Sequence, residues 1–359
     1  MAVVQSGPGP QRTSVGSGAG APGKGAGLAV TGSGAEGTSA MKTPPRSQYS
    51  PSMRKPLHVG VLTVLFAVTL VVGARRIAWE RLQAPRFDLR KQGSKTPGTF
   101  GLTFEDVTLD SGGRALKAFY VAPPPGGPAL LIFHGNGESI SSWTPVQKLL
   151  FDHGVGSMVF DYSGFGRSQG PARVENFVRD GSVAWSAFKS RLAQGTRACA
   201  YGLSLGSGVL LEAAPALQPA PDCLAIWGGY TSLVGAGVRS KRLPRWMAPL
   251  LPDALVSVQN IARAPVPVLV EHGGQDELFP PADAQALAAA APQGSRLLIL
   301  PGYTHGQPVI TPDEGAWVPV VALVRNVPES AVAAVVPPVR PPEPAALGAG
   351  ISTAAPQQQ

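Results

Sequence analysis

The sequence predicts an α/β fold with a mostly parallel central sheet and helices on both of its faces. Between residues 97 and 335, short apolar runs alternate with longer amphipathic ones, which is the βα pattern of such folds. Several of the short runs, such as Ala129–Phe133, are apolar throughout, as strands buried on both faces are. Ligands of such sheets bind beyond the carboxyl ends of the strands, so candidate functional residues are sought there.

The expected elements follow from these runs in chain order. Phe104–Leu109 and Leu116–Val121 are expected to form a leading antiparallel pair around a turn rich in Gly, Ser and Asp. The other strands are expected at Ala129–Phe133, Ser157–Phe160, Ala198–Tyr201, Leu224–Trp227, Val268–Glu271 and Arg296–Leu300. Helices are expected at Ser141–His153, Val174–Leu192, Val209–Ala214, Ala282–Ala291 and Pro312–Arg325. The segment at about 229–264 is expected to form a short helical cap.

The two ends of the chain differ in composition from residues 97–335. Residues 1–52 form a leader with almost no large apolar side chains, and residues 336–359 form a Pro/Ala-rich tail, so both are expected to be disordered. Residues 53–76 contain the uncharged stretch Leu57–Ala74, which would rise about 27 Å as a helix and roughly match a bilayer core. This segment predicts a single-pass membrane anchor. A cleaved signal sequence, which would leave a secreted protein, is the alternative.

The net charge of +8 belongs to the N-terminal part of the chain. Residues 1–96 carry 13 Lys/Arg against 3 Asp/Glu, whereas the rest carries 17 against 19, so no nucleic-acid surface is expected. Residues 35–56, before the apolar stretch, hold four Lys/Arg, and residues 75–95, after it, hold seven. Because basic residues are more frequent on the cytoplasmic side of a membrane span, this slightly favours a catalytic domain in the cytoplasm. Cys199 and Cys223 are expected to be buried thiols rather than a disulfide, and they leave the redox compartment open.

The motif Gly202-Leu203-Ser204-Leu205-Gly206 lies between an expected strand and an expected helix. A sharp strand-turn-helix connection that presents a serine is typical of the nucleophile of a serine hydrolase. Glycines fit on either side because the backbone doubles back there and leaves no room for a β-carbon. Ser204 is therefore the candidate nucleophile, and the alternative is a Gly/Ser-rich turn without chemistry.

A nucleophilic serine needs a base that accepts its proton and a carboxylate that orients the base. Among the five histidines, His305 is favoured as the base because it lies in its own loop after the last strand. His272 is a weaker candidate because it begins the loop that carries the acid. Asp276 is the candidate acid, with a turn or capping aspartate as the alternative. Glu271 and Glu277 are the competing carboxylates of this loop.

A glycine-rich turn, His134-Gly135-Asn136-Gly137, follows the third expected strand. Such a turn lets a backbone amide point at a developing oxyanion, and the amides of Asn136 and Leu205 are the expected oxyanion hole. His134 is expected to hold this loop in place. No His, Cys or carboxylate cluster has the spacing of a metal site, so neither a metal nor a cofactor is expected.

These motifs resemble those of the α/β-hydrolase superfamily, through the order Ser204, Asp276, His305, the HGNG turn and the run DYSGFGRSQG at 161–170. More narrowly, the chain is similar to the membrane-anchored alpha/beta-hydrolase-domain branch, which includes monoacylglycerol and lysophospholipid lipases and protein depalmitoylases. The resemblance covers about residues 100–326. It also rests on Asn260-Ile261 before Pro265–Val270 and on the acid loop ending at Phe279-Pro280.

The resemblance implies an α/β-hydrolase fold and a catalytic triad of Ser204, Asp276 and His305. It also implies an oxyanion hole from Asn136 and Leu205. Asp161 would then be a structural residue at the end of a strand. Two positions depart from the usual pattern without touching the triad: Ser163 stands where arginine is usual, and Ser207 stands where glycine is commoner.

The expected activity is hydrolysis of carboxylic esters or thioesters through an acyl-enzyme intermediate. The cap contains four basic residues next to apolar ones. This composition fits a helix that lies on an anionic lipid surface, and it fits equally well an amphipathic cap that only covers the active site. With the apolar span nearby, a small-molecule or lipid acyl ester is the expected substrate and a membrane the expected partner. The alternatives are peptidase or acyltransferase chemistry on the same triad, and a non-catalytic membrane-tethered interaction protein. Oligomeric state, acyl length and head group are left open.

Overall fold

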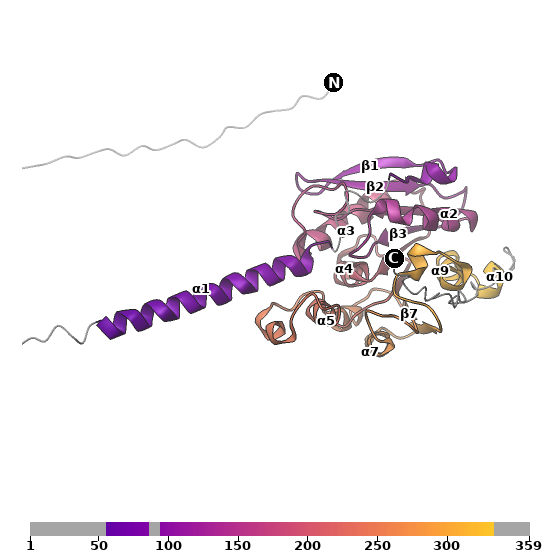
Figure 1. Ribbon diagram of the computed structural model, residues 1–359. Coiled ribbons are helices and arrows are strands. Elements are labelled where there is room, and N and C mark those ends of the chain that lie inside the picture. The colour runs from indigo at the N-terminus through magenta and orange to yellow at the C-terminus, as the bar shows by residue number, and fades with distance from the viewer. Residues whose placement is uncertain (1–54, 86–93, 334–359) are drawn as a thin grey trace, which may run out of the picture. The chain divides into compact units, whose positions relative to one another are not determined.

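The computed structural model describes residues 55–85 and 94–333 of the 359-residue chain. The predictions for the leader, residues 1–52, and for the tail, residues 336–359, lie outside the described residues. At the centre is one eight-stranded sheet with the order β1-β2-β4-β3-β5-β6-β7-β8 (Figure 1). The strands follow the order of the chain except that β4 lies between β2 and β3, and helices connect the parallel strands.

Seven of the strands share one direction and only β2 runs against its neighbours. The strands are β1 (Glu105–Asp110), β2 (Ala115–Val121), β3 (Ala129–Phe133), β4 (Gly156–Phe160), β5 (Ala198–Leu203), β6 (Cys223–Trp227), β7 (Val268–Gly273) and β8 (Arg296–Leu300). Every residue of the five strands from β3 to β7 is buried, which explains their continuous apolar runs. The predicted fold class and the leading antiparallel pair are confirmed.

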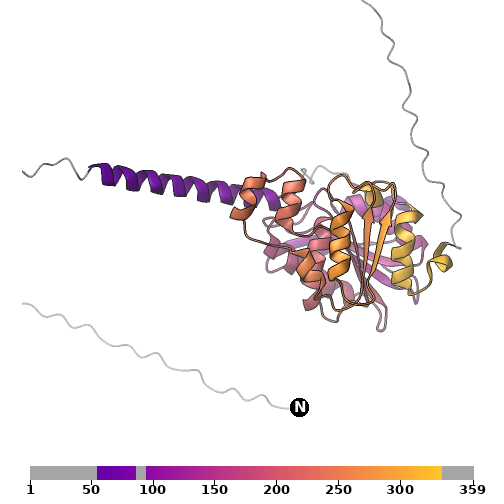
Figure 2. The ribbon, with the colours of Figure 1, turned by 90° about the horizontal axis from the view of Figure 1, so that it is seen from below.

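Helices cover both faces of the sheet. The larger ones are α2 (Thr144–Asp152), α3 (Val174–Lys189), α4 (Leu205–Ala213), α7 (Pro281–Ala290) and α9 (Glu314–Arg325). Buried side chains of α2 and α9 form one core cluster, and those of α3, α4 and α7 belong to the other. Figure 2 shows the strands between α7 (orange) on one side and α9 (yellow) on the other. The helices on both faces therefore bury the five central strands from β3 to β7, whereas β8 at the edge of the sheet is partly exposed.

Short elements complete this arrangement. The segment between β6 and β7 contains α5 (Leu233–Arg239), the 3-10 helix η6 (Arg245–Leu250) and α6 (Ser257–Ile261). Elsewhere the chain forms η3 (Pro97–Phe100), η4 (Ile140–Trp143), η5 (Ala214–Ala216), α8 (Gln307–Ile310) and α10 (Glu329–Ala333). The helix after β5 begins at Leu205, four residues before the predicted start, because the glycines and serines of its first turn give no apolar pattern.

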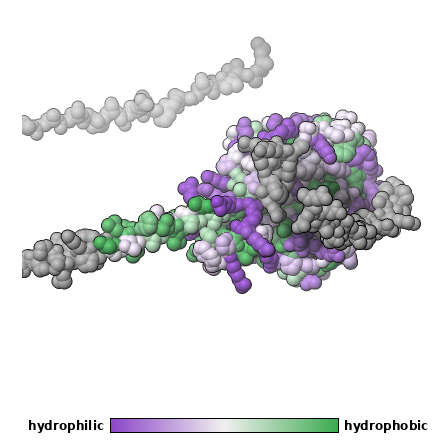
Figure 3. All heavy atoms as spheres, in the orientation of Figure 1, coloured by the Kyte–Doolittle hydropathy of each residue, from purple (hydrophilic) through white to green (hydrophobic). Residues whose placement is uncertain are grey.

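The helix α1 (Lys55–Gln83) is long and apolar enough over Val59–Gln83 to cross a membrane. Its apolar side chains from Val59 to Val72 are exposed, and Figure 3 shows hydrophobic residues (green) along it. At its end, by contrast, Leu82 and Gln83 are buried. The Gln83 side chain accepts a hydrogen bond of 2.7 Å from the amide of Val174, at the start of α3. The end of α1 is therefore part of the folded domain.

The two cysteines contradict the prediction of free thiols. Cys199 of β5 lies directly opposite Cys223 of β6, with their Cα atoms 4.7 Å apart, and the two form a disulfide. That distance is within the range that disulfides need. The sequence shows only that 24 positions separate the cysteines, whereas the register of the two strands decides that they meet.

One carboxyl group is buried in the core without a partner. Glu271 of β7 has no exposed surface, and neither of its oxygens has a hydrogen-bond partner within residues 55–85 and 94–333. Burial raises the pKa of Glu271 well above its ordinary value of 4.5, and the charge of Glu329 raises it further, whereas Arg296 acts in the opposite direction. Burial without a partner therefore favours the neutral form of Glu271.

This burial predicts a pH-dependent cost to stability. The folded state binds the Glu271 proton more tightly than the unfolded chain does. The free energy of unfolding should therefore fall by about 1.4 kcal/mol for each unit that the pH rises between the ordinary and the raised pKa. Glu271→Gln keeps the shape of the neutral acid and removes the ionisation. We expect denaturant unfolding to show a variant that is more stable than wild type at pH 8, with the difference shrinking towards pH 5.

The matched control is Glu175→Gln, because Glu175 is an exposed residue of α3. It should follow the wild-type pH profile. A Glu271→Gln profile parallel to that of wild type would contradict the assignment of a buried neutral acid.

Candidate active site

Ser204 lies in a strained turn between β5 and α4. Its φ of 53° and ψ of −116° are a conformation that residues with a side chain rarely adopt. The turn brings the first residues of α4 against β5 and the end of β3. A β-carbon at Gly202 would lie 2.6 Å from the carbonyl oxygen of Gly206, and one at Gly206 would overlap the carbonyl of Phe133. Glycine is therefore required on both sides of Ser204, as the motif predicts.

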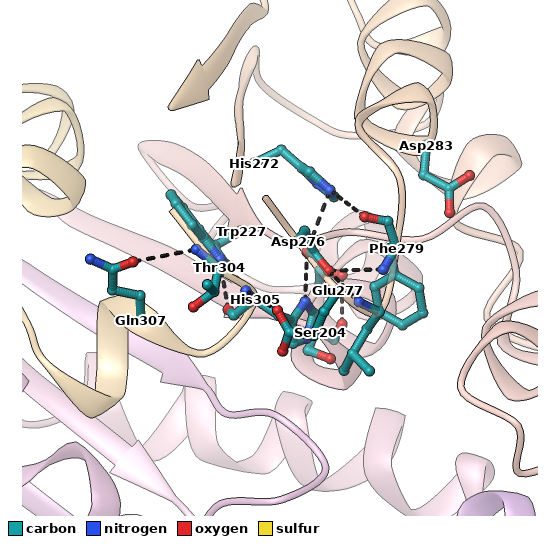
Figure 4. Close-up of polar contacts among 12 residues, drawn as sticks. Ser204, Trp227, His272, Asp276, Glu277, Phe279, Asp283, Thr304, His305 and Gln307 are labelled. Carbon is teal, nitrogen blue, oxygen red and sulfur yellow. Dashed lines mark hydrogen bonds and ion pairs between the residues drawn. The ribbon is translucent and has the colours of Figure 1, made fainter. Parts of the chain in front are cut away.

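Two of the other candidates, His305 and Asp276, are hydrogen-bonded to each other (Figure 4). His305 follows β8 and Asp276 follows β7, so both lie beyond the carboxyl ends of neighbouring parallel strands. The Nδ1 atom of His305 is 2.7 Å from Oδ2 of Asp276. Because the carboxylate only accepts, Nδ1 carries the proton and Nε2 has a free lone pair. Nε2 is buried and has no hydrogen-bond partner among the described residues of the chain.

The carboxylate of Asp276 is oriented by several donors. Its Oδ1 accepts hydrogen bonds of 2.8 Å from the amides of Leu278 and Phe279, and Nε2 of His272 lies 3.4 Å from its Oδ2. Burial raises the pKa of Asp276, but the hydrogen bond and charge of His305 and the two amides outweigh it, and the pKa falls below its ordinary value of 3.8. Asp276 is thus a charged carboxylate at neutral pH.

The loop that carries His305 is held from both sides. The amide of His305 donates to Oε2 of Glu277 at 3.0 Å, and its carbonyl accepts from Nε1 of Trp227 at 3.0 Å. Gly228 has a φ of 56°, and a β-carbon there would come 2.9 Å from the His305 ring. The imidazole is therefore fixed by its neighbours as well as by Asp276.

The glycine-rich loop after β3 is tied to its surroundings by buried side chains. Nδ1 of His134 donates to the carbonyl of Gly135 at 2.8 Å, and burial lowers the pKa of His134 to about 4, so the ring is neutral. Glu138 accepts hydrogen bonds of 2.8 Å from the Gly135 amide and from Nε1 of Trp143. The contacts of His134 agree with its expected role in holding the loop. Glu138, which the sequence analysis does not single out, shares that role.

Asp161, at the end of β4, links the same loop to the next one. Its Oδ1 accepts a hydrogen bond of 2.9 Å from the amide of Ile140, and its Oδ2 accepts one of 3.2 Å from the amide of Arg167. Burial raises the pKa of Asp161 to about 6, against the effect of these two hydrogen bonds. These contacts agree with the structural role that the family resemblance implies.

Ser204 lies where two cavities meet. The larger, of about 510 Å³, is also lined by His305 and by polar side chains, among them Lys95, Glu138, Glu277 and Thr304. The smaller, of about 70 Å³, is mostly apolar and is lined by Leu82, Leu205, Tyr230, Leu233 and Phe279 among others. Asn136 lines both cavities. The five predicted site residues are therefore brought together, four of them on cavity walls and Asp276 behind His305.

Residues from distant parts of the chain complete the site. Nη1 of Arg242, which follows α5, donates to Oδ1 of Asn136 at 2.8 Å, and its Nη2 donates to the carbonyls of Arg81 and, at 2.7 Å, Ala84. Nδ2 of Asn136 also donates to the Ala84 carbonyl, at 3.2 Å. Sequence reasoning missed Leu82 and this role of Arg242, because no local pattern shows that the end of α1 reaches the loop after β3.

The competing candidates lie elsewhere. Nε2 of His272 donates a hydrogen bond of 3.0 Å to the Phe279 carbonyl and lies 3.4 Å from Oδ2 of Asp276, and His272 lines neither cavity. Glu271 is buried in the core, and Glu277 binds the backbone of the His305 loop rather than its ring. The geometry therefore favours Asp276 and His305 over the other acids and the other base.

Known proteins match the chain in sequence and in structure. A family profile described as "Serine aminopeptidase, S33" matches residues 127–260. The uncharacterized protein Rv2307c of Mycobacterium tuberculosis is 31% identical over 209 residues, which cover 56% of this chain and 73% of that protein. Alpha/beta hydrolase domain-containing protein 17C of Mus musculus is 28% identical over 183 residues, covering 49% of this chain and 53% of that protein. The Pyrococcus furiosus esterase Pf2001 has the same fold, with a TM-score of 0.55 at 16% identity over 68% of this chain and 99% of its own.

Proposed function

Because this chain belongs to the α/β-hydrolase superfamily, we propose that it is a serine hydrolase with Ser204, His305 and Asp276 as its catalytic triad. The observation that carries the proposal is the 2.7 Å hydrogen bond between His305 and Asp276, with Nε2 left unpartnered on a cavity that Ser204 also lines. This arrangement leaves Nε2 as the ring nitrogen available to accept a proton from a serine hydroxyl.

The reaction then proceeds in two halves. Nε2 of His305 takes the proton of Ser204 as the hydroxyl oxygen attacks the substrate carbonyl, and it returns that proton to the leaving alcohol or thiol. The acyl-enzyme that remains is cleaved by water through the same steps. Asp276 keeps Nδ1 protonated and stabilises the imidazolium, which its lowered pKa allows because the carboxylate stays charged.

The amides of Asn136 and Leu205 are the proposed oxyanion hole. Leu205 is the first residue of α4, so its amide has no carbonyl partner within the helix and lies at the positive end of the helix dipole. Asn136 lines both cavities beside Ser204, and its side chain is held by Arg242 and the Ala84 carbonyl. Donors fixed before the reaction stabilise a developing negative charge without reorganisation.

The two cavities support a division of the substrate between them. The small apolar cavity suits the acyl group, whereas the larger and more polar one suits the alcohol or thiol that leaves.

We propose that the chain belongs to the membrane-anchored branch of alpha/beta-hydrolase-domain proteins. We also propose that its substrate is a carboxylic ester or thioester with a lipid-like acyl chain. Trp246, 70% exposed, and Leu250 lie in η6 near Arg245, a combination that favours contact with an anionic lipid surface.

A peptidase is the second candidate, and two observations favour it. The matching family profile is described as a serine aminopeptidase, and Glu138 and Glu277 both line the larger cavity. Carboxylates there would attract the free amino group of a peptide. Glu138, however, already accepts hydrogen bonds from Gly135 and Trp143, and Glu277 accepts one from the His305 amide, so both are occupied within the protein.

We further propose that residues 53–76 anchor the chain in a membrane and that residues 97–335 form the catalytic domain, with residues 229–264 as its cap. The apolar stretch of α1 supports the anchor.

Two observations bear on the side of the membrane that the domain faces. The excess of basic residues after the stretch slightly favours the cytoplasm, whereas the disulfide favours an oxidising compartment. Because the difference in basic residues is small, we propose the oxidising side.

Replacing the nucleophile is the first test of the proposal. A fluorophosphonate probe should label the wild-type protein covalently, and Ser204→Ala should abolish labelling and lower ester hydrolysis about 10⁴-fold or more. Ser182→Ala is the matched control, because Ser182 lies in α3 and its hydroxyl bonds to the Val178 carbonyl. An unlabelled wild type would favour a non-catalytic interaction protein. Labelling that survives Ser204→Ala would mean that another residue is the nucleophile.

A substrate panel separates ester chemistry from peptide chemistry. We expect the purified full-length protein in detergent to hydrolyse nitrophenyl decanoate at least as well as nitrophenyl acetate, because an apolar cavity adjoins Ser204. Alanine nitroanilide should be a poor substrate. A steep preference for acetate would argue against lipid-like substrates, and efficient release of nitroaniline would favour the aminopeptidase.

Whether Cys199 and Cys223 are oxidised in cells tests on which side of the membrane the catalytic domain lies. If the domain faces an oxidising compartment, Cys199 and Cys223 should be paired in cells, so a maleimide-polyethylene glycol should shift the denatured protein on a gel only after reduction. A Cys199→Ala, Cys223→Ala double variant should not shift under either condition. A full shift of the unreduced wild-type protein would place the domain in the cytoplasm instead.

A further inference from the structure

The small apolar cavity beside Ser204 has an unexpected wall. Most of its lining comes from α4, the cap and the loop after β7, but Leu82 comes from the last turn of α1. The two parts of the chain are far apart in sequence, since α1 ends at Gln83 and the cap helix α5 begins at Leu233. The helix that is apolar enough to cross a membrane therefore ends at the candidate acyl pocket.

Leu82 is packed firmly into this position. It is only 3% exposed, and it lies so close to Gly237 of α5 that a β-carbon at residue 237 would overlap its Cδ1 atom. Gly237 lines the same cavity. Because Gly237 has ordinary helical geometry, only the contact with Leu82, and to a lesser degree Leu243, opposes a side chain there.

Polar contacts fix the backbone on either side of Leu82. Arg242 donates to the carbonyls of Arg81 and Ala84, a favourable position for a cation because these carbonyls lie at the negative end of the helix. The side chain of Gln83 accepts the hydrogen bond from Val174. The Leu82 side chain is thus held against the pocket from both sides and does not belong to a freely moving helix end.

We propose that Leu82 is a specificity-determining residue that limits the width of the acyl pocket, and with it how efficiently Ser204 turns over longer acyl groups relative to short ones. The inference rests on the proposed function, because it assigns the acyl group to the cavity of about 70 Å³. Leu82 is the residue of α1 that lines this cavity, so the size of its side chain sets how much room the cavity has on that side.

The experiment measures acyl selectivity in the full-length protein. For each variant, the ratio of kcat/KM for nitrophenyl octanoate to kcat/KM for nitrophenyl acetate is determined in the same detergent. Leu82→Ala removes the side chain from the wall and should raise the ratio about tenfold, in line with the effect of a few methylenes in an apolar pocket. Gly237→Ala pushes the Leu82 side chain into the pocket and should lower the ratio by a similar factor.

The double variant Leu82→Ala, Gly237→Ala provides the sharpest result. The new β-carbon at residue 237 would occupy space that the missing leucine side chain leaves, so the ratio should return close to the wild-type value. Leu65→Ala is the matched control, because Leu65 lies in the same helix and is 57% exposed. Its ratio should equal that of wild type. If Leu82→Ala does not fold, Gly237→Ala, which keeps Leu82, must still lower the ratio.

Failure of this inference is distinguishable from failure of the proposed function. Equal ratios in wild type, Leu82→Ala and Gly237→Ala, together with labelling by a small fluorophosphonate that depends on Ser204, would overturn the role of Leu82 alone. Loss of that labelling in the wild-type protein would overturn the serine hydrolase itself. A ratio in the double variant no closer to wild type than in the single variants would show that the two residues do not share one pocket.

Discussion

The close approach of α4 to the ends of β3 and β5 is the constraint on which the site depends. No side chain fits at Gly206, where a β-carbon would overlap the Phe133 carbonyl, and none fits at Gly202. This contact forces Ser204 into a strained conformation in which its side chain leaves the turn towards the cavities. It also brings the first amide of α4 next to the loop after β3. The strain is sustained because buried strands surround it on both sides.

The acidic groups of the domain show how donors decide which carboxylates are charged. Asp276 has two backbone amides and the His305 ring around it, and its pKa falls below the ordinary value in spite of burial. Asp161 accepts hydrogen bonds from two amides, but burial outweighs them and the charge of Arg167, and its pKa rises to about 6. Glu271 has no donor among the described residues, and burial raises its pKa well above the ordinary value. Burial therefore raises the pKa of each of these acids, and only around Asp276 do the hydrogen bonds and the neighbouring histidine outweigh it.

Sequence patterns predicted the regular elements well where the reason was local. Ala129–Phe133 is a strand at the predicted bounds because an apolar run buried on both faces has few other places in a fold. Asp276 and His305 were found because each follows such a strand. The helix after β5 was predicted four residues late, since glycine and serine hide its first turn. The cysteine pair was predicted wrongly, because strand register, which no local pattern reveals, sets Cys199 opposite Cys223.

The sequence by itself determined the sheet, the turn at Ser204 and the chain order of the candidate triad, because these depend on apolar periodicity and on glycines within a few residues of each other. Only the tertiary structure decided what surrounds them: the disulfide, the clamp that Arg242 makes between Asn136 and the end of α1, and the position of Leu82 beside Ser204. Those contacts join residues that lie far apart along the chain. They depend on strand register and helix packing, which form only once the whole core has assembled.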